Sequence, residues 1–126
     1  MSITSFDYAQ IINQLCPDSL FNIVQNNYTT LVWNRSNSFD KPSESEIIAK
    51  NTEMINILAY EELRSMRNSL LNESDKYSLL DYPHPNDNIR TQWLTYRNDL
   101  RNITTQTPIL NIETLEISGI TWPTPP

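Results

Sequence analysis

Few residues of the types that carry out chemistry occur in this 126-residue chain, and their spacing does not bring them together. His84 is the only histidine and stands between Pro83 and Pro85, while Cys16 is the only cysteine. A thiol nucleophile needs a neighbouring base, so Cys16 and His84 could act as a pair only if the fold joined two distant positions. The simpler interpretation is a loop histidine and a small buried thiol.

The acidic residues and the single glycine indicate no catalytic site either. Gly119 stands alone, so no glycine-rich loop exists to bind a phosphate group. No cluster of metal-ligating residues is present at the usual spacing. The carboxylates are explained by acidic helix starts and solvated faces; they include Glu44, Glu46, Glu61, Glu62, Glu73 and Asp75. We therefore expect no enzyme activity, no cofactor and no bound metal.

The stretch "IRTQWLTYRNDLRNIT", residues 89–104, combines arginines with large aromatics, which is a pattern that nucleic-acid-binding proteins also use. At about 100° per residue, however, the apolar and the basic residues fall on different stripes of one helix. The apolar stripe is Ile89, Trp93, Tyr96, Leu100 and Ile103, and the second stripe is Arg90, Arg97 and Arg101. We expect a packed apolar face with the arginines at its border, in ion pairs with Asp87, Asp99 or a neighbouring element.

The charge balance argues against nucleic acid as the main partner. Fifteen acidic residues stand against nine basic ones, for a net charge of −6, whereas nonspecific nucleic-acid affinity comes chiefly from cations. No apolar stretch approaches the ~18 residues that span a bilayer, and the N-terminus lacks the pattern of a signal peptide. We expect a soluble protein that is made and kept in a reducing cytoplasm, with no membrane partner.

The first third of the chain predicts a small helix followed by a β-hairpin. Residues 7–15 carry apolar side chains at helical spacing, with Asp7 as the cap. The β-branched segments that follow flank Asn26 and Asn27, which tolerate the left-handed conformation of a tight turn. Leu31 and Trp33 share one face of the second strand, so that face should be covered.

Two helices should follow and form an antiparallel pair. Ser43 and Glu46 have the spacing of a capping box, and apolar residues continue to Leu70 with several repeats at eleven residues. Such a repeat predicts a stripe that drifts around the helix, or a bend near Ala59. The prolines around His84 end this region, and the helix of the arginine stretch begins at Asn86 or Asp87 and runs to about Thr104.

The remaining residues predict an extended, β-rich arm. Leu110 and Ile112 would share one face and Leu115 and Ile117 the other, so we expect strands broken by bulges, one of them at Gly119. Trp122 stands in a proline-rich tail, where a large aromatic is best explained if the tail docks on the body or on a partner. The residues expected to contact a partner are Leu115, Ile117, Ile120, Trp122, Pro123 and Pro126.

Taken together, these patterns indicate an α+β fold in a single domain, residues 1–126. The domain comprises an α/β head (1–40), a helical part (43–104) and an extended arm (105–126).

The order of these motifs resembles the bacteriophage tail assembly chaperone family, also called tail fibre assembly proteins. That family shows L-R-x-x-R-N-x-L-L-x-x-S-D, then W-x-x-Y-R-x-x-L-R, and closes on W-P-x-x-P. The first motif corresponds to Leu63, Arg64, Arg67, Asn68, Leu70, Leu71, Ser74 and Asp75. The second corresponds to Trp93, Tyr96, Arg97, Leu100 and Arg101, and the third to Trp122, Pro123 and Pro126. The family also has a tryptophan near the end of its N-terminal α/β head, followed by a helix that starts with K-P-[ST]-x-x-E. Trp33 matches the tryptophan, and the helix start is matched by Lys41, Pro42, Ser43 and Glu46.

The chain departs from the family pattern in two places, a longer loop at residues 76–85 and a β-rich insertion at residues 107–120. The resemblance implies a non-enzymatic protein that helps a tail fibre or adhesin polypeptide to fold, trimerise or attach. It would act in the host cytoplasm during assembly, with retention in the virion tail as a further expectation. The alternative is a structural tail or virion subunit that interlocks with fibre or baseplate through the arm. The arm also allows a homo-oligomer, because strand pairing would protect its apolar edge.

Overall fold

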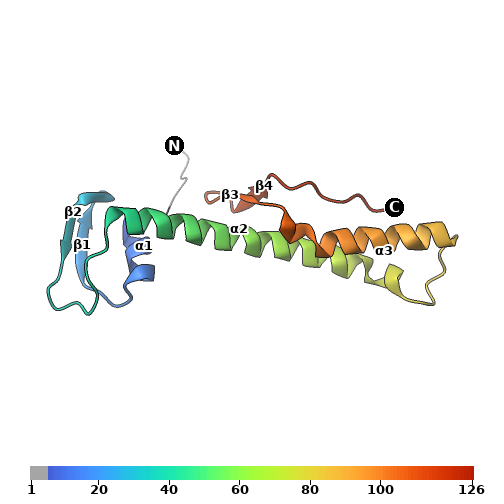
Figure 1. Cartoon of the computed structure of the whole chain (residues 1–126), viewed down its shortest axis with the longest axis horizontal. Coiled ribbons are helices and arrows are strands. Elements are labelled where there is room, and N and C mark those ends of the chain that lie inside the picture. The colour runs from blue at the N-terminus through green and yellow to red at the C-terminus, as the bar shows by residue number, and fades with distance from the viewer. Residues whose placement is uncertain (1–5) are drawn as a thin grey trace. The chain divides into compact units, whose positions relative to one another are not determined.

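The computed structural model describes residues 6–126 and shows an α+β fold, as the sequence predicted (Figure 1). Helices are combined with two small antiparallel strand pairs. The chain divides into two compact units, and the boundary falls inside the long helix α2 (Glu44–Ser74). The first unit holds the described residues up to Asn56 together with Ile112–Thr114, and the second holds Ile57–Asn111 and Leu115–Pro126. That residues 1–126 form a single domain stays a prediction.

The first unit begins with the predicted helix and hairpin. Helix α1 (Tyr8–Leu15) is capped by Asp7, whose backbone N–H donates to the side-chain oxygen of Gln10 at 3.0 Å. Strands β1 (Phe21–Val24) and β2 (Asn27–Trp33) pair in antiparallel fashion. The left-handed turn residues are Gln25 and Asn26, with φ of 50° and 57°, so the predicted turn is displaced by one residue.

The core of the first unit joins α1, the hairpin and the start of α2. Its buried residues are Ile11, Ile12, Leu31 and Ile47. Ser43 caps α2 as predicted, because its Oγ accepts the backbone N–H of Glu46 at 3.1 Å. The apolar faces of three short elements are thus buried against the first turns of α2.

Helix α2 does not carry the predicted eleven-residue stripe. Ile47, Ala59 and Leu63 are buried, but Ile48 is 53% exposed and Met66 is also exposed. From Ala59 to Ser74 the buried residues recur at the three- and four-residue spacing of an ordinary amphipathic helix. Each unit covers only the side of α2 that faces its own elements, so no single stripe runs along the whole helix.

The second unit contains the predicted antiparallel helix pair. A short 3₁₀ turn, η1 (Asp75–Ser78), ends α2, and α3 (Asp87–Arg101) runs back along it (Figure 1). Asn86 caps α3 by accepting the backbone N–H of Ile89 at 2.9 Å, and η2 (Ile103–Thr105) follows. The predicted cap and extent of this helical region are confirmed.

The arm forms a hairpin, which corrects the expected distribution of its faces. Strands β3 (Ile109–Asn111) and β4 (Glu116–Ser118) pair in antiparallel register, with Leu110 opposite Ile117. Residues opposite one another share a face, so the expectation that Leu110 and Ile117 lie on different faces is wrong. The side chains change from one face to the other because the backbone turns in the loop, where Leu115 has a φ of 60°. A second turn follows β4, where Gly119 has a φ of 80°.

Candidate partner-binding surface

The second unit is built around a buried arginine. Arg97 donates from Nη1 to the Leu71 carbonyl oxygen and to Ser74 Oγ, and from Nη2 to Asp75 Oδ1, each at 2.7 Å. A helix leaves its last carbonyls without partners, so Arg97 caps the end of α2 from α3. Arg97 thus forms the predicted ion pair with a neighbouring element, and its side chain is almost fully buried, which periodicity did not indicate. Arg101 is exposed.

An aromatic cluster continues from this arginine. Trp93 stacks on Tyr77 with ring centroids 3.9 Å apart, and Tyr96 meets Trp93 edge to face at 5.7 Å. Tyr82 and His84 extend the cluster from the loop after η1, with ring centroids 4.6 Å apart. These contacts hold the η1 loop against the first turns of α3.

His84 and Arg90 fix the backbone of that loop. His84 Nε2 lies 2.9 Å from the Tyr77 carbonyl oxygen and donates to it when Nε2 carries a proton. Arg90 donates to the carbonyl oxygens of Leu79 and Tyr82, at 3.4 and 3.2 Å. His84 therefore has a structural environment, and Cys16 belongs to the other unit.

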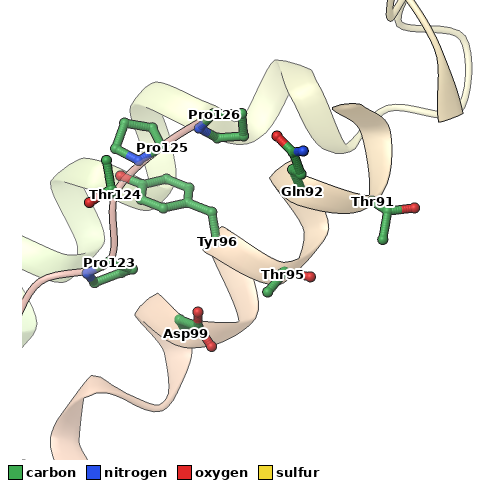
Figure 2. Close-up of a pocket in the computed structure, with 9 residues that line it drawn as sticks. All are labelled: Thr91, Gln92, Thr95, Tyr96, Asp99, Pro123, Thr124, Pro125 and Pro126. Atoms are coloured by element: carbon green, nitrogen blue, oxygen red, sulfur yellow. The ribbon is translucent and has the colours of Figure 1, made fainter. Parts of the chain in front are cut away.

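The residues after β4 return to α3 through an amide clamp. The side chain of Gln106 donates to the Thr121 carbonyl oxygen at 2.9 Å and accepts the Thr121 backbone N–H at 2.7 Å. Beyond this clamp, residues 122–126 lie along α3, with Pro125 and Thr124 beside the ring of Tyr96 (Figure 2). Trp122 and Pro123 are half-buried.

Open grooves flank residues 122–126. A groove of about 460 Å³ lies on the α3 side, lined by Thr91, Gln92, Thr95, Tyr96, Asp99 and Pro123–Pro126 (Figure 2). A second groove of about 440 Å³ is lined by Leu70, Glu73, Ser74, Tyr77, Trp93, Tyr96, Trp122, Pro123 and Pro125. Tyr96 lies between them, and burial followed by the Glu73 carboxylate raises the pKa of its hydroxyl above the ordinary 10.0. The tyrosine is therefore neutral at physiological pH.

The other predicted partner-contact residues lie on the hairpin and the segment that follows it. Leu115 is exposed in the loop, whereas Ile117 and Ile120 are half-buried. Pro126 is exposed beside α3. The structure brings Trp122, Pro123 and Pro126 together on one surface, and their role in binding stays a prediction.

The predicted core residues occupy both units. Trp33 is half-buried in the first unit, stacks on Phe21 and donates from Nε1 to the Phe39 carbonyl oxygen at 2.9 Å. In the second unit Tyr96 and Leu100 are buried, and Trp93 is half-buried beneath the ring of Tyr77.

Sequence reasoning missed two features of this surface. The first is a pair of exposed leucines, Leu79 and Leu80, of which Leu80 is 96% exposed. Two adjacent leucines in a polar loop are a sequence signal that could have marked them as an exposed apolar site. Gln106 carries no such signal, because a glutamine after a helix has no preferred long-range partner. Both features flank the helix pair of the second unit.

The only cysteine of the chain, Cys16, is buried. Burial, followed by the Glu46 carboxylate, raises the pKa of the Cys16 thiol, so the reactive thiolate is disfavoured. Within residues 6–126, no three potential metal ligands gather at one place. Across the same residues, each helix is too short or too polar to cross a bilayer.

A comparison with known families identifies what the second unit is similar to. The model of a family described as phage tail assembly chaperone protein matches residues 60–126, more than half of the chain. No curated protein and no solved structure matches the chain. The matched range includes the arginine cap, the aromatic cluster, the hairpin and the segment along α3.

Proposed function

The chain belongs to the family of phage tail assembly chaperone proteins, and from this premise we propose that it binds a tail fibre or adhesin polypeptide. Membership of the family assigns a chaperone role in phage tail assembly and a tail protein as partner. The fibre is our choice among tail proteins, because the three sequence motifs resemble tail fibre assembly proteins. The protein would assist the folding, trimerisation or attachment of that fibre.

The family match over residues 60–126 carries this proposal, and the hairpin of the arm offers the contact surface. Ile109 is 63% exposed and Leu115 is also exposed, at opposite ends of a two-stranded hairpin. Exposed β-branched and aliphatic residues of this kind bind unassembled polypeptide through apolar contact and strand addition. The half-exposed Leu94 of α3 and the exposed Leu80 enlarge the apolar surface of the same unit.

A chaperone role implies that the protein is not an enzyme, and we extend this to the absence of any hydrolase, transferase or redox activity. The raised pKa of the Cys16 thiol supports this, because a nucleophilic cysteine needs the opposite shift. We also propose that the protein needs no metal, so chelators should leave its stability and its partner binding unchanged.

Co-expression with the fibre polypeptide of the same phage tests the proposal. Soluble, trimeric fibre should be obtained with the chaperone and should be strongly reduced without it. In this assay Ile109→Asp should lower the yield of trimer. Val32→Asp is the matched control, because Val32 is 64% exposed on a strand outside the family match. Equal fibre yields with and without the chaperone would rule out the proposal.

We place the protein in the host cytoplasm during assembly. The rival function is a structural tail or virion subunit, for which the same hairpin arm would interlock with fibre or baseplate. Mass spectrometry of purified virions separates the two, because a structural subunit is present in fixed stoichiometry and an assembly factor is absent.

A further inference from the structure

The segment 122–126 is attached to its unit in an unusual way. Up to Thr121 the chain is held by the two hydrogen bonds of the Gln106 clamp. Among the described residues, no hydrogen bond connects Trp122 or the residues after it to the rest of the protein. The segment is therefore held by packing alone, chiefly by Trp122 and Pro123, which are half-buried.

The surface beneath the segment has the chemistry of a site for proline-rich peptide. Tyr96 separates the two grooves, and Trp93 and Tyr77 line one of them. Grooves with aromatic walls bind extended proline-rich segments, because such segments are rigid before binding and lose little entropy. Trp122, Pro123 and Pro125 are the residues of this chain that fit there.

The segment occupies this surface without filling it. Open volumes of about 460 and 440 Å³ remain on its two sides, and Thr124, Pro125 and Pro126 are exposed. A segment that makes no hydrogen bonds and leaves free volume beside it can leave its site at low cost. The site would then accept an identical segment from elsewhere.

We propose that residues 122–126 exchange between two copies of the chain, so that each copy's segment binds the α3 groove of the other. The same contacts form within one chain and between two chains, which makes exchange a low-cost route to a dimer. The segment would turn away at Trp122, directly after the Gln106 clamp on Thr121, which stays in place.

The reach of the segment allows this exchange. Five residues beyond the clamp extend to roughly 17 Å, which exceeds the interaxial distance of about 8 to 10 Å between two packed helices. The half-exposed Leu94 supplies an apolar contact on α3 for such packing. The exchange is independent of fibre binding, and disulfide trapping detects it without fibre.

Disulfide trapping between full-length chains tests the proposal. Thr95 and Thr124 line the same groove (Figure 2), so one chain carries Thr95→Cys and the other Thr124→Cys, both with Cys16→Ala. One chain is labelled with ¹⁵N, and the mixture is treated with oxidised glutathione. Intact-mass spectrometry should show a disulfide-linked pair containing one chain of each kind, in a fraction that rises with protein concentration.

Arg101→Cys replaces Thr95→Cys in the control, because Arg101 is exposed on α3 and lines neither groove. That control should give at most a small fraction of linked pairs. A chain carrying both Thr95→Cys and Thr124→Cys should form an intrachain disulfide when dilute and an interchain one when concentrated.

Three results would overturn the exchange. The first is an intrachain disulfide at every concentration together with the absence of mixed pairs. The second is equal linkage of the Arg101→Cys control, which would indicate random collision. The third is protection of the Thr95→Cys thiol by added fibre polypeptide without any linked pair of copies, which would assign the groove to that partner.

Discussion

Replacing Arg97 with methionine should destabilise the second unit more than any other single change at an α3 arginine. Methionine keeps most of the volume of the buried stem but removes all three hydrogen bonds of the guanidinium group. The Leu71 carbonyl oxygen and Ser74 Oγ then lose their common donor at the end of α2. Ser74 is itself buried, so water replaces the lost donor poorly.

The magnitude follows from the burial of each partner. Asp75 is 61% exposed, so its ion pair with Arg97 contributes at most about 1 kcal/mol. Hydrogen bonds to charged groups contribute about 1.5 to 3 kcal/mol each when buried, although the two on Nη1 are not independent. We expect Arg97→Met to lower the free energy of unfolding by about 2 to 4 kcal/mol. For a chain of this length the thermal midpoint should fall by roughly 8 to 15 °C.

Urea and thermal unfolding followed by circular dichroism at 222 nm measure this loss. Arg101→Met is the matched control, because Arg101 is exposed on the same helix and should change stability by less than about 0.5 kcal/mol. Asp75→Asn should cost no more than about 1 kcal/mol. If Arg97→Met were as stable as the Arg101→Met control, the cap would be energetically irrelevant. If Asp75→Asn cost as much as Arg97→Met, the ion pair would dominate.

Three further outcomes concern the first unit. Ile12→Ala should lower the free energy of unfolding by about 2 to 5 kcal/mol in urea titrations, since Ile12 is fully buried, and an equal loss for exposed Ile48→Ala would contradict this. Ser43→Ala should cost about 1 kcal/mol through loss of the helix cap, and Ser45→Ala should not show this loss. Because burial raises the pKa of the Cys16 thiol, folding favours its neutral form. The resulting stabilisation is complete below the ordinary pKa of 9.0 and is lost as pH rises through the folded value. The midpoint should therefore fall more steeply above pH 9 for the native chain than for Cys16→Ala, and parallel pH profiles would contradict this.

The sequence alone was sufficient for features that depend on near neighbours. The capping box of Ser43 and Glu46 and the cap at Asn86 were predicted because cap and first turn lie within three residues of each other. The apolar face of α3, including Tyr96 and Leu100, was predicted because the helix period places residues three and four apart on one side. The family motifs were recognised for a similar reason, since they are short patterns with fixed spacing.

Features that depend on distant partners were decided by the tertiary structure. The burial of Arg97 required the Leu71 carbonyl oxygen, which belongs to another helix, and periodicity could only place the arginine beside the stripe. The faces of the arm were misjudged because alternation fixes the parity along one strand, whereas the loop at Leu115 brings Leu110 opposite Ile117. The position of residues 122–126 on α3 depends on a surface supplied by α2, η1 and α3 together, with its aromatic rings from η1 and α3, and no single stretch of sequence contains that surface.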